Sequence, residues 1–169
     1  MFQIYYRLED LLHTQQGAAM LVLSKGDLNP IWTDVDYICN KHGCIAVYGT
    51  KEHCDHLRAA HPDIYRYHLA KAACNWLSHG KYDKSCTLRP YNEVSKHIFN
   101  KYEADYEKPN TQHSLESYLI GVYTNPGSTV FDPYGDFDIF RTVMDMGRKY
   151  IGVQENAKLR KKMVGYVDI

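Results

Sequence analysis

The stretch that decides the fold runs from Asn125 to Glu155 and reads NPGSTVFDPYGDFDIFRTVMDMGRKYIGVQE. Its first part, Ser128 to Phe131, is a short run of β-forming residues between two turn signals, so we expect a buried strand there. Apolar residues at helical spacing follow from Ile139 to Met146, and Lys149 to Val153 is again typical of a strand. The sequence therefore predicts a strand, turn, helix, strand unit. Its loop lies at the carboxyl end of a strand, where open α/β sheets bind ligands.

This unit contains two short motifs, Asp132-Pro133-Tyr134-Gly135 and Gly147-Arg148-Lys149-Tyr150-Ile151-Gly152-Val153. They resemble the cofactor half of the DNA amino-methyltransferases, which use S-adenosylmethionine to methylate N6 of adenine or N4 of cytosine. In that family the loop reads D-P-F-x-G-S-G-T-T and the second strand reads G-R-x-Y-I-G-I-E. The resemblance implies that the cofactor is surrounded by Asp132, Pro133, Tyr134, Gly135 and Gln154.

Two parts of the implied cofactor site depart from the family pattern. Asp136-Phe137-Asp138 stands where the family has glycines around a serine, and Gln154 stands where it has a glutamate that binds both ribose hydroxyls. Carboxylates at 136 and 138 would crowd and repel the cofactor's own carboxylate. An amide at 154 would weaken the ribose contact by about 1 kcal/mol or more. The alternative role for Asp136 or Asp138 is to cap the following helix, which aspartate does well.

A second candidate motif follows the apolar run Met20 to Leu23, which we expect to be a strand. In the DNA amino-methyltransferases that this sequence resembles, the loop after this strand carries D-P-P-Y or a variant. This motif accepts a hydrogen bond from the exocyclic amine of a flipped base and stacks an aromatic ring on the base. Strand position puts Ser24 to Asp27 at that place, which is no match, but Asn29-Pro30-Ile31-Trp32 resembles N-P-P-W. The resemblance implies that Asn29, Pro30 and Trp32 hold the base. The alternative is a structural Asn-Pro turn with a packed tryptophan.

The remaining segments complete an α/β pattern. We expect strands at 2–6, 44–49 and 65–71, a turn at 41–43, and helices at 7–16, 34–40, 50–60, 113–120 and 156–163. The pattern and the resemblance together predict a single domain over residues 1–169. Its fold would be α/β, a three-layer Rossmann-like methyltransferase fold with a central, mostly parallel sheet. The implied chain order is permuted, with the base-binding loop ahead of the cofactor loop.

Segment 72–110 is polar and mixed in charge, and the resemblance implies a reduced target-recognition insert there. Candidates for contacts to phosphates and bases are Arg89, Lys96 and Lys101. The alternative is a solvated face, since acidic residues are interspersed. Lys and Arg total 20 and Asp and Glu total 20, so DNA binding would require a local patch rather than an overall basic field.

The cysteines indicate a reducing environment. There are five, with no signal peptide ahead of them and no apolar run as long as a membrane span, so we expect free thiols in the cytoplasm. A zinc site is suggested by Cys39, His42, Cys44, His53, Cys54 and His56. Structural zinc sites show clean pairs such as C-x2-C with H-x3-H, and these spacings give none. We therefore expect no metal.

The departures from pattern bear on function. A third one is the Lys108-Pro109 pair, displaced from the place where the family has H-P-T-Q-K-P ahead of a helix. Functional elements that drift inside a kept scaffold favour a methyltransferase-like protein that has lost catalysis, needs no cofactor, and binds DNA or a protein partner. The short chain suits a phage protein that acts on host restriction or modification, and a homodimer is compatible. The alternative is an active minimal DNA adenine-N6 or cytosine-N4 methyltransferase, or another S-adenosylmethionine-using enzyme.

Overall fold

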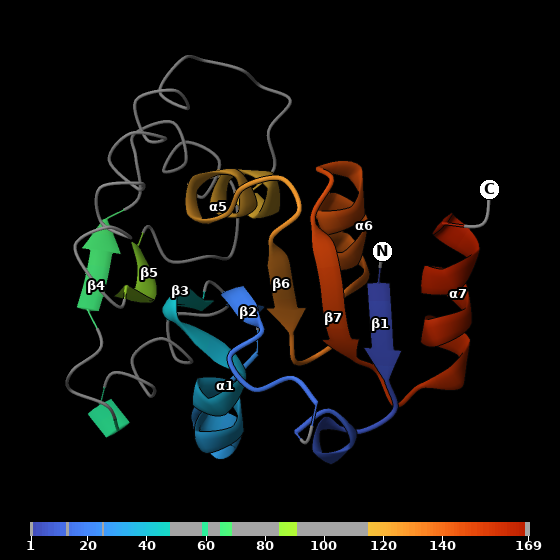
Figure 1. Cartoon of the computed structure of the whole chain (residues 1–169), viewed down its shortest axis with the longest axis horizontal. Helices are drawn as coiled ribbons and strands as arrows, with labels where there is room; N and C mark the ends of the chain where they lie inside the picture. The colour runs from blue at the N-terminus through green and yellow to red at the C-terminus, as the bar shows by residue number, and fades with distance from the viewer. Residues whose placement is uncertain are drawn as a thin grey trace.

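The centre of the molecule is a mostly parallel sheet. The computed structural model describes residues 2–12, 14–24, 26–47, 59–60, 65–68, 85–90 and 115–167. Its strands follow the order β1-β7-β6-β2-β3-β5-β4 across the sheet (Figure 1). Neighbours from β1 to β3 are parallel, and β5 runs antiparallel to both β3 and β4. The strands are β1 (Phe2–Tyr5), β2 (Ala19–Ser24), β3 (Cys39–Val47), β4 (Tyr65–His68), β5 (Ser85–Pro90), β6 (Thr129–Asp132) and β7 (Lys149–Val153).

Helices cover both faces of this sheet. They are α1 (Trp32–Ile38), α5 (Leu115–Tyr123), α6 (Phe137–Asp145) and α7 (Ala157–Val167), with two short 3₁₀ turns, η1 (Leu8–Asp10) and η2 (Asn29–Ile31). The apolar residues of α5, α6 and α7 join one core cluster and those of α1 join another. Within the described residues, no helix is both long enough and apolar enough to cross a bilayer.

The two cores arise from alternation along the inner strands. Leu21, Val130 and Tyr150 point toward α5, α6 and α7. Their next neighbours Val22, Phe131 and Ile151 point toward α1. Successive strand residues face opposite ways, so a strand that is apolar throughout is buried on both faces. The arrangement confirms the predicted three-layer α/β fold.

The predicted unit at 125–155 is present, with β6, α6 and β7 close to their expected bounds. Asp136 is the N-cap of α6, and its side chain accepts a hydrogen bond from the backbone N–H of Ile139. Ile139, Phe140 and Val143 are buried, as their helical spacing predicts. Aspartate capping, one of the two roles considered for residue 136, is therefore what the structure shows.

Two local predictions were wrong. The expected helix at 7–16 is only the turn η1 followed by irregular chain, although Leu11 is fully buried as the leucine spacing suggested. Short helices depend on packing, and here the side chain of Gln15 instead bonds to Gln3 and Tyr5 of β1. The turn expected at Lys41-His42-Gly43 lies inside β3. Between the pairs Ala19↔Cys39 and Leu21↔Cys44, β2 advances two residues while β3 advances five, so the glycine signal marks a bulge.

Several expectations fall outside the described residues. These include most of the helix expected at 50–60, the greater part of segment 72–110, and the side chains of His53, Cys54 and His56. Of the remaining cysteines, Cys39 is buried in the core beside α1 and forms no disulfide within the described residues. Among the residues that the structure does describe, no group of three or more metal-binding side chains is found.

Candidate functional site

The candidate site lies where β6 and β2 end side by side. These parallel strands are neighbours in the middle of the sheet, but β6 continues through α6 to β7 on one side and β2 continues through α1 to β3 on the other. Such a change in direction at the carboxyl ends of the strands is where α/β proteins bind ligands, and we call this place the crevice. Residues 133–136 follow β6 there, and residues 26–32 lie after the end of β2.

Asp132, the last residue of β6, organises the first of these loops. It is fully buried, and its Oδ2 accepts hydrogen bonds from Tyr150 Oη at 2.8 Å and from the Asp136 N–H at 2.7 Å. Its Oδ1 accepts a third from the Tyr134 N–H at 3.3 Å. Burial raises the pKa of Asp132 to about 7, although these hydrogen bonds oppose the rise. The buried carboxyl group of Asp132 therefore holds the loop after β6 in place.

Asp132 should make stability depend on pH. Its pKa rises from 3.8 to about 7 in the fold, so the folded protein holds this proton more tightly than the unfolded chain does. Its contribution to the free energy of unfolding is thus complete below pH 4, falls as pH rises to 7, and then levels off. Integrated over that window, the rise from 3.8 to about 7 corresponds to roughly 4 kcal/mol. Urea unfolding from pH 4.5 to 8 should show a steeper fall for wild type than for Asp132→Asn, and equal slopes would contradict this account.

Gly152 allows Tyr150 to reach Asp132. Gly152 is the β7 residue paired with Asp132, and it lies on the same face of the sheet as Tyr150. A Cβ at Gly152 would collide with the hydroxyl and ring of Tyr150, so the ring lies directly over the glycine. The missing side chain creates the path for the Tyr150 hydroxyl to the end of β6.

Gly135 packs the loop against the end of β7. Its φ is +58°, and a Cβ there would collide with the Val153 carbonyl and come within 2.8 Å of Gln154 Cβ. Gln154 is buried, its Nε2 donates to the Gly135 carbonyl at 3.0 Å, and its Oε1 accepts from the Asn156 N–H at 2.9 Å. Both ends of the Gln154 amide are thus engaged within the protein. Arg160 of α7 fixes the same residue from outside by donating to the Gln154 carbonyl at 2.7 Å.

Tyr134 joins the two loops across the crevice. A Cβ at Gly26 would lie 2.6 Å from the Tyr134 ring, so this ring packs on the loop after β2. The Tyr134 hydroxyl donates to the Asp27 carbonyl, and Asp27 Oδ1 in turn accepts from the Asn29 N–H at 3.0 Å. A series of hydrogen bonds therefore links the β6 loop to η2 through Asp27. Pro133 is buried behind Tyr134.

The three candidate base-binding residues follow directly on this loop. Asn29 and Pro30 form the start of η2, with Pro30 exposed. Trp32 begins α1 and packs, half-buried, against the core cluster on the α1 face. Asn29 is linked to the β6 loop through Asp27, and the assignment of Asn29, Pro30 and Trp32 to base binding stays a prediction.

The candidate DNA-binding residues are only partly covered. Arg89 lies in β5, where it pairs with Ile45 of β3. Lys96 and Lys101 lie outside the described residues. Sequence reasoning did not identify the contact of Tyr134 with Asp27 or that of Arg160 with Gln154. No sequence signal links these residues, because each contact joins side chain to backbone across separate elements.

The residues at the site do not fit S-adenosylmethionine as they stand. A ribose-binding side chain at 154 would have to face the crevice, but the Gln154 amide bonds to Gly135 and Asn156. The start of α6, where backbone N–H groups favour an anion, is occupied by the Asp136 carboxylate. A bound amino-acid carboxylate would meet this charge at close range.

Comparison of the sequence with models of protein families and with curated proteins finds no match. Solved structures do match in fold. M1.HpyAVI superposes with a TM-score of 0.67 at 13% identity, over 100% of this chain and 100% of that chain. TTHA0409 of Thermus thermophilus, in complex with S-adenosyl-L-methionine, gives 0.61 at 10% identity over 96% and 91%. The cytosine-N4-specific PvuII DNA methyltransferase gives 0.56 at 12% identity over 96% and 85%.

The chain therefore has the fold of the DNA methyltransferases. The likeness extends over nearly the whole of each structure, which confirms the fold that the motifs at 132–135 and 147–153 indicated. At identities of 10–13% the likeness concerns architecture. Function has to be argued from the crevice and its residues.

Proposed function

We propose that this protein is a methyltransferase-like protein that does not transfer methyl groups and acts by binding a macromolecular partner, DNA or another protein. The observation that carries the proposal is the Gln154 amide. It is buried and hydrogen-bonded to Gly135 and Asn156, at the position where the resemblance implies a ribose-binding glutamate. A cofactor would have to break these contacts and would gain only neutral hydrogen bonds in return.

Asp136 supports the same proposal from the other side of the loop. The Asp136 carboxylate caps α6 by accepting a hydrogen bond from the Ile139 N–H, and the Asp136 N–H donates to the Asp132 carboxyl group. The loop is therefore satisfied internally, and its negative charge opposes an anionic ligand. A scaffold of this kind keeps its stability when catalysis is lost, because the contacts that hold the loop do not involve a ligand.

The second candidate is an active minimal DNA methyltransferase. The observation in its favour is that the tight turn at Gly135 and the anchoring of the loop by Asp132 and Tyr150 are intact. The path from the β6 loop through Asp27 to Asn29 also keeps a base-binding candidate beside the crevice. Cofactor affinity distinguishes the two candidates, because only the active enzyme requires it.

Calorimetric titration provides that test. We expect neither S-adenosylmethionine nor S-adenosylhomocysteine to produce binding heat, or to raise the melting temperature of the wild-type chain, at about 1 mM ligand. A dissociation constant in the micromolar range would overturn the proposal and favour the active enzyme. The next measurement would then be methyl transfer to duplex DNA, with Asn29→Ala as the comparison.

The class of partner can be tested separately by the fluorescence anisotropy of a labelled DNA duplex. A DNA-binding role predicts an affinity that falls steeply as salt rises, because phosphate contacts release counterions. If the anisotropy does not change when the protein is added, even at low salt, binding to duplex DNA is excluded and a protein partner is the next to test. The similarity to a structure described as a DNA methyltransferase makes DNA the first partner to test.

A further inference from the structure

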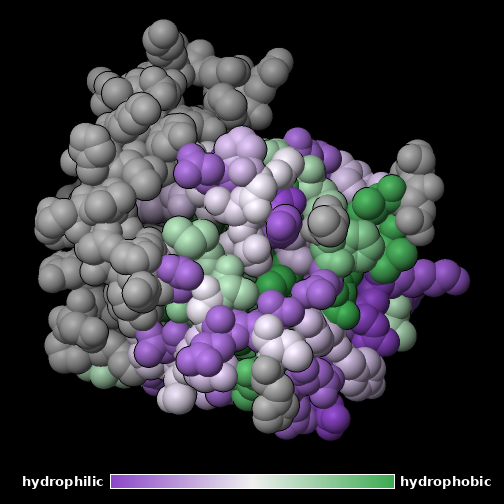
Figure 2. All heavy atoms as spheres, viewed as in Figure 1, coloured by the Kyte–Doolittle hydropathy of each residue, from purple (hydrophilic) through white to green (hydrophobic). Residues whose placement is uncertain are grey.

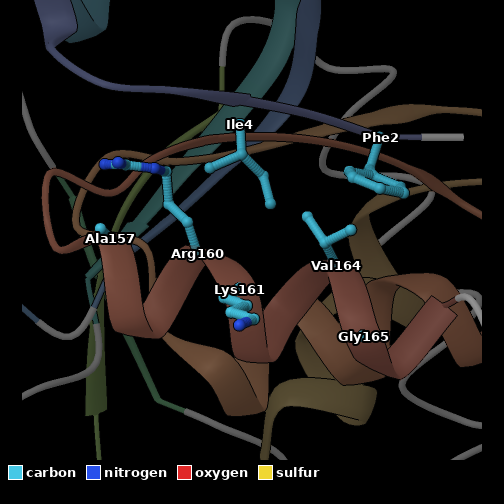
Figure 3. Close-up of a pocket in the computed structure, with 7 residues that line it drawn as sticks. All are labelled: Phe2, Ile4, Ala157, Arg160, Lys161, Val164 and Gly165. Carbon is cyan, nitrogen blue, oxygen red and sulfur yellow. The ribbon is translucent and has the colours of Figure 1, made fainter.

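A groove lies at the outer edge of the sheet, between β1 and α7. Its volume is about 620 Å³, and Figure 3 shows the residues that line it. Phe2 and Ile4 of β1 point toward α7, and Arg160 and Val164 rise from α7 toward the strand, with Lys161 beside them. The floor is therefore apolar and two cations flank it. Figure 2 shows apolar and strongly hydrophilic residues side by side on the part of the surface where α7 lies.

The backbone of β1 is available at this edge. β1 is the terminal strand of the sheet, with β7 as its neighbour among the described strands. The Tyr5 carbonyl accepts from the Gln154 N–H at 2.9 Å, so Tyr5 and, by alternation, Gln3 direct their polar groups toward the β7 side. The backbone N–H and C=O groups of Phe2 and Ile4 consequently point to the outer edge of the sheet. Those are also the residues whose side chains line the groove, which makes the edge a template for an added strand.

The charge of α7 indicates what such a strand would carry. Between Ala157 and Val167 the helix has no acidic residue and four cations, Lys158, Arg160, Lys161 and Lys162. They lie in the first half of the helix, where positive charge opposes the helix dipole, so helix stability does not explain them. Arg160 stacks over Tyr6 and Lys162 over Phe137, whereas no ion pair to Lys161 is found among the described residues. The acids that flank the helix in sequence are Glu155 and Asp168.

The same charge argues against a second copy of this chain in the groove. Antiparallel pairing of two β1 edges about a two-fold axis would continue the sheet and put both α7 helices on the same face. Their lysines would then approach each other across the axis, and like charges so placed repel. The acidic side chains of a partner would instead be attracted to the cations of α7.

We propose that the β1–α7 groove binds an extended acidic segment of a partner protein, which adds to β1 as a further strand. Every second side chain of the segment faces α7; among these, an apolar one lies between Ile4 and Val164, and an acidic one pairs with Lys161 or a neighbouring cation. The proposal goes beyond the function argued above and holds whether or not the cofactor site works. The groove lies at the edge of the sheet, while the candidate crevice lies at its centre.

The test is an NMR titration of the full ¹⁵N-labelled chain with an acetylated, amidated peptide in which valine and glutamate occupy every second position in turn, with threonine between them, so that both side chains face the same side of the strand. The expected result is saturable shift changes at the amides of Phe2, Ile4 and α7. A peptide with lysine in place of glutamate should bind about tenfold or more weaker. Lys161→Glu should weaken the acidic peptide about tenfold, whereas Lys149→Glu, an equal charge change on an exposed residue outside the groove, should change it less than about twofold.

Two further peptides test strand addition itself. One is N-methylated at the valines and glutamates and the other at the threonines between them, so side chains are kept while alternate N–H donors are lost. We expect only one of them to retain binding, since an added strand directs only alternate N–H groups at β1. Equal binding of both, unaffected affinity in Lys161→Glu, or shift changes confined to other surfaces would overturn the proposal. So would a short DNA duplex that shifts the same amides and is not displaced by the acidic peptide.

Discussion

Gly152→Ala is expected to lower the free energy of unfolding by about 3 kcal/mol or more, a large part of the stability of a domain this size. The added Cβ would collide with the Tyr150 ring, and that ring is held between the buried core and Asp132. Tyr150 cannot move aside without leaving Asp132 short of one hydrogen bond in a site without solvent. Chemical denaturation of both proteins measures the difference.

A matched control is Gly165→Ala in α7. Apart from its chain neighbours and the backbone of its own helix, no atom lies within 4 Å of a Cβ built at Gly165, so alanine there should be neutral or stabilise the helix by about 0.5–1 kcal/mol. A double-mutant cycle tests the cause. If the clash with Tyr150 is responsible, Gly152→Ala should cost less in a Tyr150→Leu background than in wild type. Equal costs in both backgrounds would mean that another contact of β7 is responsible.

The sequence was most informative where local signals agree with tertiary packing. The unit 125–155 combines a turn, an apolar strand, a capping aspartate and a helical apolar stripe, and each signal alone favours the element that forms. Over 7–16 the leucines mark a buried surface, but the chain reaches it through turns because Gln15 bonds to β1. At Gly43 the turn signal is real, yet flanking strand pairs confine it to a bulge.

The sequence could indicate where the candidate site lies, but only in part how its side chains are hydrogen-bonded. The motif at 132–135 marked the loop, and the residue types at 136 and 154 indicated that the loop departs from its family pattern. The sequence could not show where the Gln154 amide points, because its partners are the carbonyl of Gly135 and the N–H of Asn156. Backbone partners leave no trace in residue identity. The same is true of the Tyr134 contact with the Asp27 carbonyl.

The double variant Asp136→Gly with Gln154→Glu is expected to create the affinity for S-adenosylmethionine that we propose the wild-type chain lacks. Removal of the Asp136 carboxylate clears the helix N-terminus for an anionic group. Glutamate at 154 cannot donate to the Gly135 carbonyl, so its carboxylate is released from the contact that now holds the amide. If each change contributes about 1.4 kcal/mol, the dissociation constant should fall about 100-fold, into the range that calorimetry detects.

The fold should survive these changes, which makes the outcome interpretable. Glycine is a good N-cap, weaker than aspartate by only a few tenths of a kcal/mol, and thermal unfolding confirms that the variant is folded. Asp138→Gly is the matched comparison, because Asp138 is exposed in the first turn of α6, where it pairs with Arg141 at 3.2 Å. That variant should gain little or no affinity. If the double variant is folded and still binds no cofactor, the crevice between β6 and β2 is not a latent cofactor site, and the argument from Gln154 loses its basis.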